Sequence, residues 1–116
     1  MVKRTLERGS LYIKSDVLAM ITEICVKEVA GVSILAGFKD GFSGLINKNY
    51  QKKGITVIED EDEIRIEVKV ALEYGVKIRQ TCELLQAAIL HEIKSMTGIN
   101  LSNLTIKVEG LTTETT

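Results

Sequence analysis

The sequence is poor in aromatic residues: it has no tryptophan, and aromatic side chains make up 4% of its 116 residues. So few rings leave little material for base-stacking platforms or aromatic cages, and the core is expected to be aliphatic. Fifteen basic residues against sixteen acidic ones give a net charge of −1. This balance lacks the basic excess of nucleic-acid-binding domains, so no nucleic acid partner is expected.

Cysteine is almost as scarce. Cys25 and Cys82 lie far apart in the sequence and lack the C-x-x-C spacing of zinc sites or dithiol redox sites. Both fall on or beside the apolar stripe of an expected helix. The sequence predicts buried, reduced thiols that act as small hydrophobic side chains, with a disulfide between them as the alternative.

Long hydrophobic runs are absent too. No stretch approaches the roughly 20 apolar residues that span a membrane. The basic segment 1–8 is not followed by the apolar region of a secretory signal. These features predict a cytoplasmic protein that does not insert directly into the membrane.

The strongest periodic signals occupy residues 63–98. Every second residue of the first part is apolar, which predicts a strand with one buried face: Ile64, Ile66, Val68, Val70 and Leu72. After Gly75 the apolar residues recur at steps of four and three, which predicts one stripe along a helix of about 20 residues that ends before Gly98: Ile78, Cys82, Leu85, Ile89, Ile93 and Met96.

The N-terminal third predicts a strand and a first helix. A polar lead at residues 1–8 precedes a short strand at 9–13. Ser15 and Asp16 suit the start of a helix, as a cap and as a favourable charge at its positive end. The expected helix ends at Gly31, and its apolar face is predicted to contain Val17, Met20, Ile21 and Ile24.

Between the helices and after them, shorter signals alternate with loops. Residues 32–36 and 55–58 are typical of strands, and residues 99–110 contain a last strand with alternating apolar positions. Residues 37–54 lose all periodicity and predict a loop or an irregular edge. The acidic run at 59–63 predicts a solvated hairpin turn, because it lacks the spaced pattern and turn glycine of a calcium loop.

These elements follow the order β-α-β-loop-β-β-α-β. They predict a two-layer α+β fold: a mixed sheet of about four to five strands with two amphipathic helices packed on one face. The other face is expected to be either solvated or an interface. We expect one domain over residues 1–116, with flexible ends at 1–8 and 112–116.

No set of residues predicts catalysis, a metal or a cofactor. The only histidine, His91, turns away from the helix stripe and lacks a second histidine four residues away. Ser43 is not in a G-x-S-x-G turn. Catalytic, cofactor-binding and metal-binding residues are therefore all predicted to be none.

One motif keeps a second hypothesis open. Gly41-Phe42-Ser43-Gly44 matches the G-x-x-G loop with which KH domains clamp an RNA backbone. Four lysines make the surrounding segment locally basic, which is typical of a soluble loop and is also compatible with an anion or an acidic partner: Lys39, Lys48, Lys52 and Lys53. A KH-like RNA-binding domain is therefore the alternative hypothesis.

Short motifs occur in a fixed order along nearly the whole chain. They are Gly9-x-Leu11-x-Ile13, Asp16-Val17-Leu18, Glu28-Val29-Ala30-Gly31-Val32, Lys53-Gly54-Ile55-Thr56-Val57, Tyr74-Gly75-Val76-x-Ile78, Gln86, Thr97-Gly98-Ile99 and Leu104-Thr105-Ile106-x-Val108-x-Gly110. With these motifs the chain resembles the alkaline shock protein family of envelope-stress proteins in Gram-positive bacteria.

The resemblance implies a small non-enzymatic cytoplasmic protein that serves cell-envelope homeostasis through protein-protein interaction. Members of that family gather beneath the membrane by binding a membrane-anchored partner, and the same is implied here, with self-association into a homo-oligomer as a further option. The shared positions are glycines and apolar residues that define turns and core. The resemblance therefore carries over no catalytic residue, and the interaction surface stays unknown.

Overall fold

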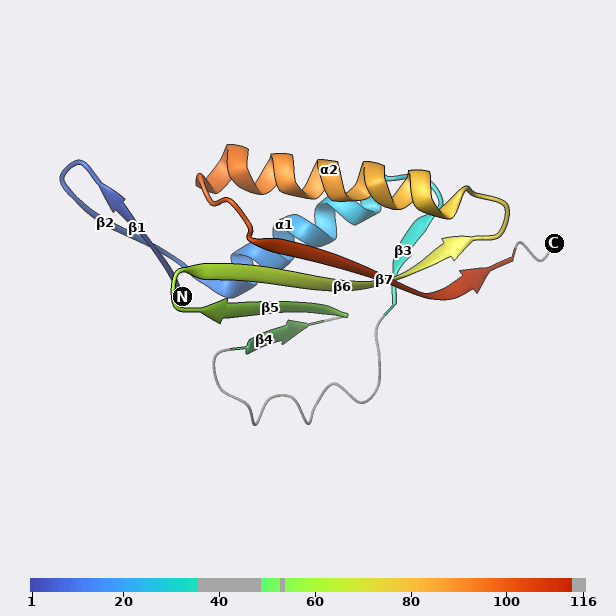
Figure 1. Ribbon diagram of the computed structural model, residues 1–116, viewed down its shortest axis with the longest axis horizontal. Helices are drawn as coiled ribbons and strands as arrows, with labels where there is room; N and C mark the ends of the chain where they lie inside the picture. Colours follow the sequence, from blue (N-terminus) through green and yellow to red (C-terminus); the bar gives the residue numbers. More distant parts are fainter. Residues whose placement is uncertain (36–48, 53, 114–116) are drawn as a thin grey trace.

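The computed structural model describes residues 1–35, 49–52 and 54–113, with no account of the side chains of residues 49–52. Two helices and seven strands make up this part of the chain (Figure 1). The helices are α1 (Ser15–Glu28) and α2 (Ile78–Thr97). The strands are β1 (Val2–Leu6), β2 (Gly9–Ile13), β3 (Val32–Ile34), β4 (Asn49–Lys52), β5 (Ile55–Asp60), β6 (Glu63–Glu73) and β7 (Asn103–Thr112).

The longest strand, β6, organises the sheet. It pairs with β7 in parallel along one edge and with two antiparallel strands, β5 and β3, along the other. β5 covers the first part of β6 and β3 the last part, and β4 extends the sheet beyond β5. Lys69 lies on β6 between the residues that pair with β5 and those that pair with β3. Its carbonyl oxygen accepts a hydrogen bond from the Leu35 amide, and its amide donates one to the Gly54 carbonyl, both at 2.9 Å. The predicted mixed sheet is confirmed.

The predicted pattern of β6 is confirmed as well. Its five alternating apolar residues are all buried against the helices, while Arg65 and Glu67 point to the other face. Both helices cover the same face of the sheet, so the two-layer α+β architecture also holds (Figure 1). Hydrophobic burial across this single interface forms the core.

Helix α2 buries the middle of its predicted stripe and exposes the ends. Leu85, Ile89 and Ile93 have no exposed surface, whereas Ile78 and Met96 are exposed. The helix therefore packs on the sheet mainly through Leu85, Ile89 and Ile93. Gly98 ends the helix in the left-handed conformation, with φ +78°, as the sequence predicts.

The predicted face of α1 is wrong except at Ile21. The buried residues are Leu18, Ala19, Ile21, Thr22, Cys25 and Val26, whereas Val17, Met20 and Ile24 are exposed. Thr22 lies at the centre of the buried face, where its hydroxyl donates to the Leu18 carbonyl at 2.9 Å. A hydroxyl that makes a hydrogen bond is tolerated in the core. Thr22 therefore occupies a buried position where a periodic pattern would be expected to have an apolar residue.

The N-terminal segment also differs from the prediction. Instead of a polar lead, Val2–Leu6 forms β1, which pairs with β2 in an antiparallel hairpin that projects from the body (Figure 1). Only the base of this hairpin is buried, at Val2 and Ile13. Ser15 does not cap α1, since the cap position is Lys14 and carries no side-chain cap bond.

The face of the sheet away from the helices carries charged side chains along β6. Arg65, Glu67 and Lys69 alternate along it from β6, and the Lys107 ammonium lies 3.3 Å from a Glu67 carboxylate oxygen. Such a partly exposed ion pair contributes little to stability, on the order of 0–1 kcal/mol. This part of the face therefore has a mixed pattern of charges without a dominant sign.

Candidate functional site

The two cysteines are free. Cys25 is buried, and its Sγ lies 3.9 Å from the Ala88 carbonyl oxygen on α2. Burial raises the pKa of the Cys25 thiol above its ordinary value, and the carboxylates of Glu92 and Glu28 raise that pKa further. Burial also raises the pKa of Cys82, which is half-buried. Both thiols therefore stay protonated at neutral pH, as expected of side chains that fill space.

The other candidates from the sequence do not come together. His91 is exposed on α2, as predicted, and residues 60–63 form an exposed turn between β5 and β6. Within the described ranges, no three histidine, cysteine, aspartate or glutamate side chains are placed to hold a metal ion. Gly41 to Gly44, Lys39, Lys48 and Lys53 lie outside the described residues, as does the side chain of Lys52.

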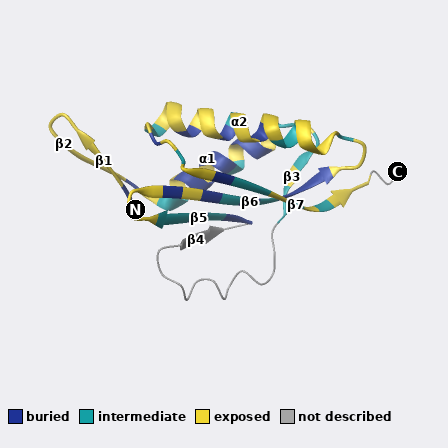
Figure 2. Cartoon of the chain, in the orientation of Figure 1, coloured by how far each residue is buried: buried dark blue, intermediate teal, exposed yellow. Residues whose placement is uncertain are grey.

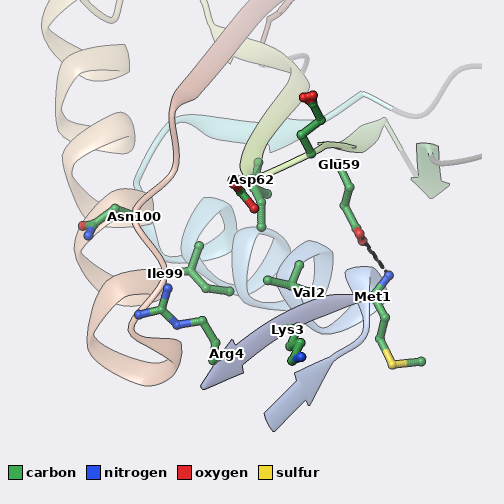
Figure 3. A pocket seen from close by; sticks show the side chains of 10 residues that line it. Met1, Val2, Lys3, Arg4, Glu59, Asp62, Ile99 and Asn100 are labelled. Atoms are coloured by element: carbon green, nitrogen blue, oxygen red, sulfur yellow. Dashed lines mark hydrogen bonds and ion pairs between the residues drawn. The ribbon is translucent and has the colours of Figure 1, made fainter. Parts of the chain in front are cut away.

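A cavity of about 470 Å³ opens between the base of the hairpin and the β5–β6 turn (Figure 3). Three apolar residues line it: Val2 on β1, Ile64 on β6, and Ile99 in the connection between α2 and β7. Charged side chains of both signs line it as well: Lys3, Arg4, Glu59, Glu61 and Asp62. The cavity thus lies between basic residues of β1 and the acidic β5–β6 turn.

Glu59 anchors the N-terminus to this cavity. Its carboxylate oxygens accept hydrogen bonds from the Met1 ammonium at 2.8 and 3.0 Å (Figure 3). The Ser15 hydroxyl donates to the same carboxylate. Burial raises the pKa of Glu59, but the hydrogen bonds and the charge of the ammonium together outweigh it, so the pKa lies below its ordinary value of 4.5. Sequence reasoning placed Glu59 in the solvated run and missed this contact, because the partners lie 58 and 44 residues away.

We expect Glu59→Gln to lower the free energy of unfolding by about 1–2 kcal/mol at pH 7, because it removes charge-assisted hydrogen bonds. Because the pKa of Glu59 is lower in the folded state, its ionised carboxylate stabilises the fold at pH values above the unfolded-state pKa of about 4.5. This stabilisation is lost as the pH falls through the folded-state pKa. The difference between wild type and variant should therefore shrink in urea titrations from pH 7 to pH 3. Glu61→Gln, in the exposed turn, is the control; a difference at Glu59 that persists unchanged at pH 3 would contradict this electrostatic account.

Exposed apolar side chains are the feature that sequence reasoning missed. Val17, Met20 and Ile24 form an exposed stripe along α1, and Leu6 and Tyr12 are exposed on the hairpin. Exposed positions follow most of this hairpin outside its base (Figure 2). The signal was present, since the α1 residues follow helical spacing, but that spacing was assigned to the core. No helix in the described ranges is long and apolar enough to cross a membrane.

The fold and its surface define a class: a small two-layer α+β domain with exposed apolar side chains and, in the part described, no group of three side chains placed to hold a metal ion. The chain belongs to the alkaline shock protein 23 family, which is described as having a cell envelope-related function. The model of this family matches residues 3–113. The resemblance drawn from the short motifs is thereby confirmed.

Relatives of similar length occur in two bacteria. The uncharacterized protein YloU of Bacillus subtilis is 23% identical over 106 residues, which cover 89% of this chain and 88% of that protein. The uncharacterized protein Spy1535 of Streptococcus pyogenes is 31% identical over 109 residues, covering 93% and 83%, and Spy1614 of the same organism is 26% identical over 113 residues, covering 95% and 93%. No solved structure matches the chain significantly.

Proposed function

We propose that this protein is a non-enzymatic interaction module of the cell envelope that works from the cytoplasm, where it self-associates or docks on a membrane-anchored protein. The family's cell envelope-related function supports the setting. The RNA-binding alternative gains no support, because its loop lies outside the described residues and the family description names the envelope.

The main support for the proposal is a set of large apolar side chains that are exposed to solvent. Met20 and Ile24 are each more than half exposed on α1, and Leu6 and Tyr12 are similarly exposed on the projecting hairpin. Single exposed apolar residues are common, but several on one face of a helix, as on α1, mark an interaction surface. A two-stranded hairpin is also only marginally stable alone, which favours a partner that covers it.

Direct binding to lipid fits the surface less well. An interfacial helix needs a wide apolar face beside a strongly basic one, whereas α1 carries Asp16, Glu23 and Glu28 along with Lys27. The basic residues of the hairpin are Lys3, Arg4 and Arg8, with Glu7 among them. Three cations add only weak attraction to anionic lipid, so stable membrane association is expected to require a protein partner.

The test is affinity purification of the tagged protein from cross-linked native cells, followed by mass spectrometry of the membrane fraction. We expect a membrane-anchored protein to be enriched, and less of it after Tyr12→Glu on the hairpin. As the control, purified protein should stay in the supernatant when sedimented with anionic vesicles at physiological salt. Enrichment of ribosomal proteins alone, or pelleting with bare vesicles, would contradict the proposal.

A further inference from the structure

One face of α1 carries an apolar stripe that the described part of the fold leaves exposed. Val17 is 43% exposed, Met20 56% and Ile24 52%. Spacings of three and four residues place these side chains on one face of the helix. The opposite face, with Leu18 and Val26, is fully buried in the core. Helix α1 is thus apolar on both faces, as expected of a helix packed on two sides.

The stripe is self-complementary under a two-fold rotation. Met20 and Ile24 lie equally far along the helix from the level of Thr22, so two antiparallel copies of α1 crossing at this level bring Met20 of one opposite Ile24 of the other. A two-fold interface uses the same patch on both subunits, and each contact occurs twice. Antiparallel helices pack side chains of this size at 8–10 Å between their axes.

The charges beside the stripe fit the same arrangement. Asp16 lies in the first turn of α1 and Lys27 in the last turn. Because they are 11 residues apart, close to three helical turns, both lie on the same flank of the stripe. Antiparallel pairing places Asp16 of one copy near Lys27 of the other, at both ends of the interface. Lys27 is well exposed and holds Glu23 of its own helix at 3.3 Å, which leaves further ammonium protons for a second carboxylate.

We propose that the α1 stripe is the contact between two copies of this chain, paired antiparallel through α1; the inference rests on the proposed interaction function and assigns it a surface. Three apolar side chains per subunit bury less than the roughly 1,200 Å² of a standard interface. The dimer is therefore expected to be weak and to form only as concentration rises.

Analytical ultracentrifugation from about 1 μM to 1 mM tests the pairing. The wild type is expected to pass from monomer to dimer, and Met20→Glu is expected to stay monomeric, because it places two carboxylates in the contact. Leu84→Glu is the matched control, since Leu84 is 68% exposed on α2 and lies outside the stripe. Melting temperatures of both variants, measured at low concentration, establish that each one folds.

A charge exchange tests the orientation. Asp16→Lys and Lys27→Glu, each alone, put like charges together at both ends of the interface and are expected to weaken the dimer about tenfold. The double variant Asp16→Lys/Lys27→Glu restores opposite charges and should bring the dissociation constant back to the wild-type range. Weakening in both single variants without restoration in the double variant would overturn the antiparallel arrangement.

The outcomes separate this inference from the proposed function. A wild-type protein that stays monomeric at 1 mM, yet still captures a membrane protein in cells, overturns only the α1 pairing. A dimer abolished equally by Met20→Glu and Leu84→Glu also overturns it, because the stripe would then not be specific. A dimer sensitive only to the stripe, with no envelope partner in cells, supports the pairing and contradicts docking on a membrane protein.

Discussion

Gly54→Ala is expected to destabilise the fold by at least about 3 kcal/mol. Gly54 adopts φ +80°, a left-handed conformation that costs other residues about 1–2 kcal/mol. A Cβ atom at this position would also overlap the Leu35 carbonyl oxygen, with the Leu35 carbonyl carbon at 3.2 Å. The obstacle is backbone, so the clash cannot be relieved by a side-chain rotation.

The position explains the size of the effect. Gly54 and Leu35 both pair with Lys69, at the point on β6 where β3 gives way to β5. Moving either backbone to admit a methyl group would break the hydrogen bond that its strand makes with the central strand. Only glycine allows two strand ends to meet this closely beside one residue of their neighbour.

Gly75→Ala is the matched control. Gly75 also has positive φ, at +106°, but nothing lies within 4 Å of the Cβ position. Both substitutions reduce the entropy of the unfolded chain equally, so the difference between them isolates the steric clash. Urea unfolding should show a cost of about 1–2 kcal/mol at Gly75 and a clearly larger cost at Gly54; equal costs would mean that β3 and β5 are not in close contact.

The sequence predicted best those elements whose pattern repeats over many residues. In β6 and α2, five alternating strand positions and the central residues of the helix stripe are buried as expected. The periodic patterns agree with the boundaries marked by Gly75 and Gly98, both of which have positive φ. Where local preference and burial pattern point the same way, the assignment holds without knowledge of the tertiary fold.

The face of α1 could not be assigned in the same way. The helix offers two apolar stripes, one through Met20 and Ile24 and one through Leu18 and Cys25, and Thr22 weakens the second. The sheet packs against the second stripe, and a hydrogen bond within the helix satisfies the threonine. Which stripe is buried depends on how α1 is oriented against strands formed by residues far away, and no local pattern contains that information.

Contacts between residues that lie far apart in the sequence could not be predicted either. Strand β1 was missed because its polar residues do not alternate strongly with apolar ones, and its pairing with β2 is what makes it a strand. Glu59 looked like one of five equivalent carboxylates, yet it alone among them holds Ser15 and the Met1 ammonium. The candidate surface on α1 follows from the same limitation, since a side chain is known to be exposed only after the rest of the core is placed.

Two adjacent leucines on α2 give the sharpest test of this core. Leu85 has no exposed surface and packs between the helices and the sheet, whereas Leu84 is 68% exposed. Successive residues on a helix are about 100° apart, so the two side chains point in different directions from the same turn. Their chemistry, helix propensity and distance from the helix ends are nearly identical.

Leu85→Ala is therefore expected to cost about 2–5 kcal/mol, from lost hydrophobic transfer and from the cavity left in the core. Leu84→Ala should stay within about 0.5 kcal/mol, as expected for a surface position, and Glu61→Ala in the acidic turn should do the same. Denaturant midpoints at constant m-value provide the measurement. A cost at Leu84 equal to that at Leu85 would mean that α2 is rotated on the sheet, and such a rotation would also change which apolar side chains of α1 and α2 are left exposed for a partner.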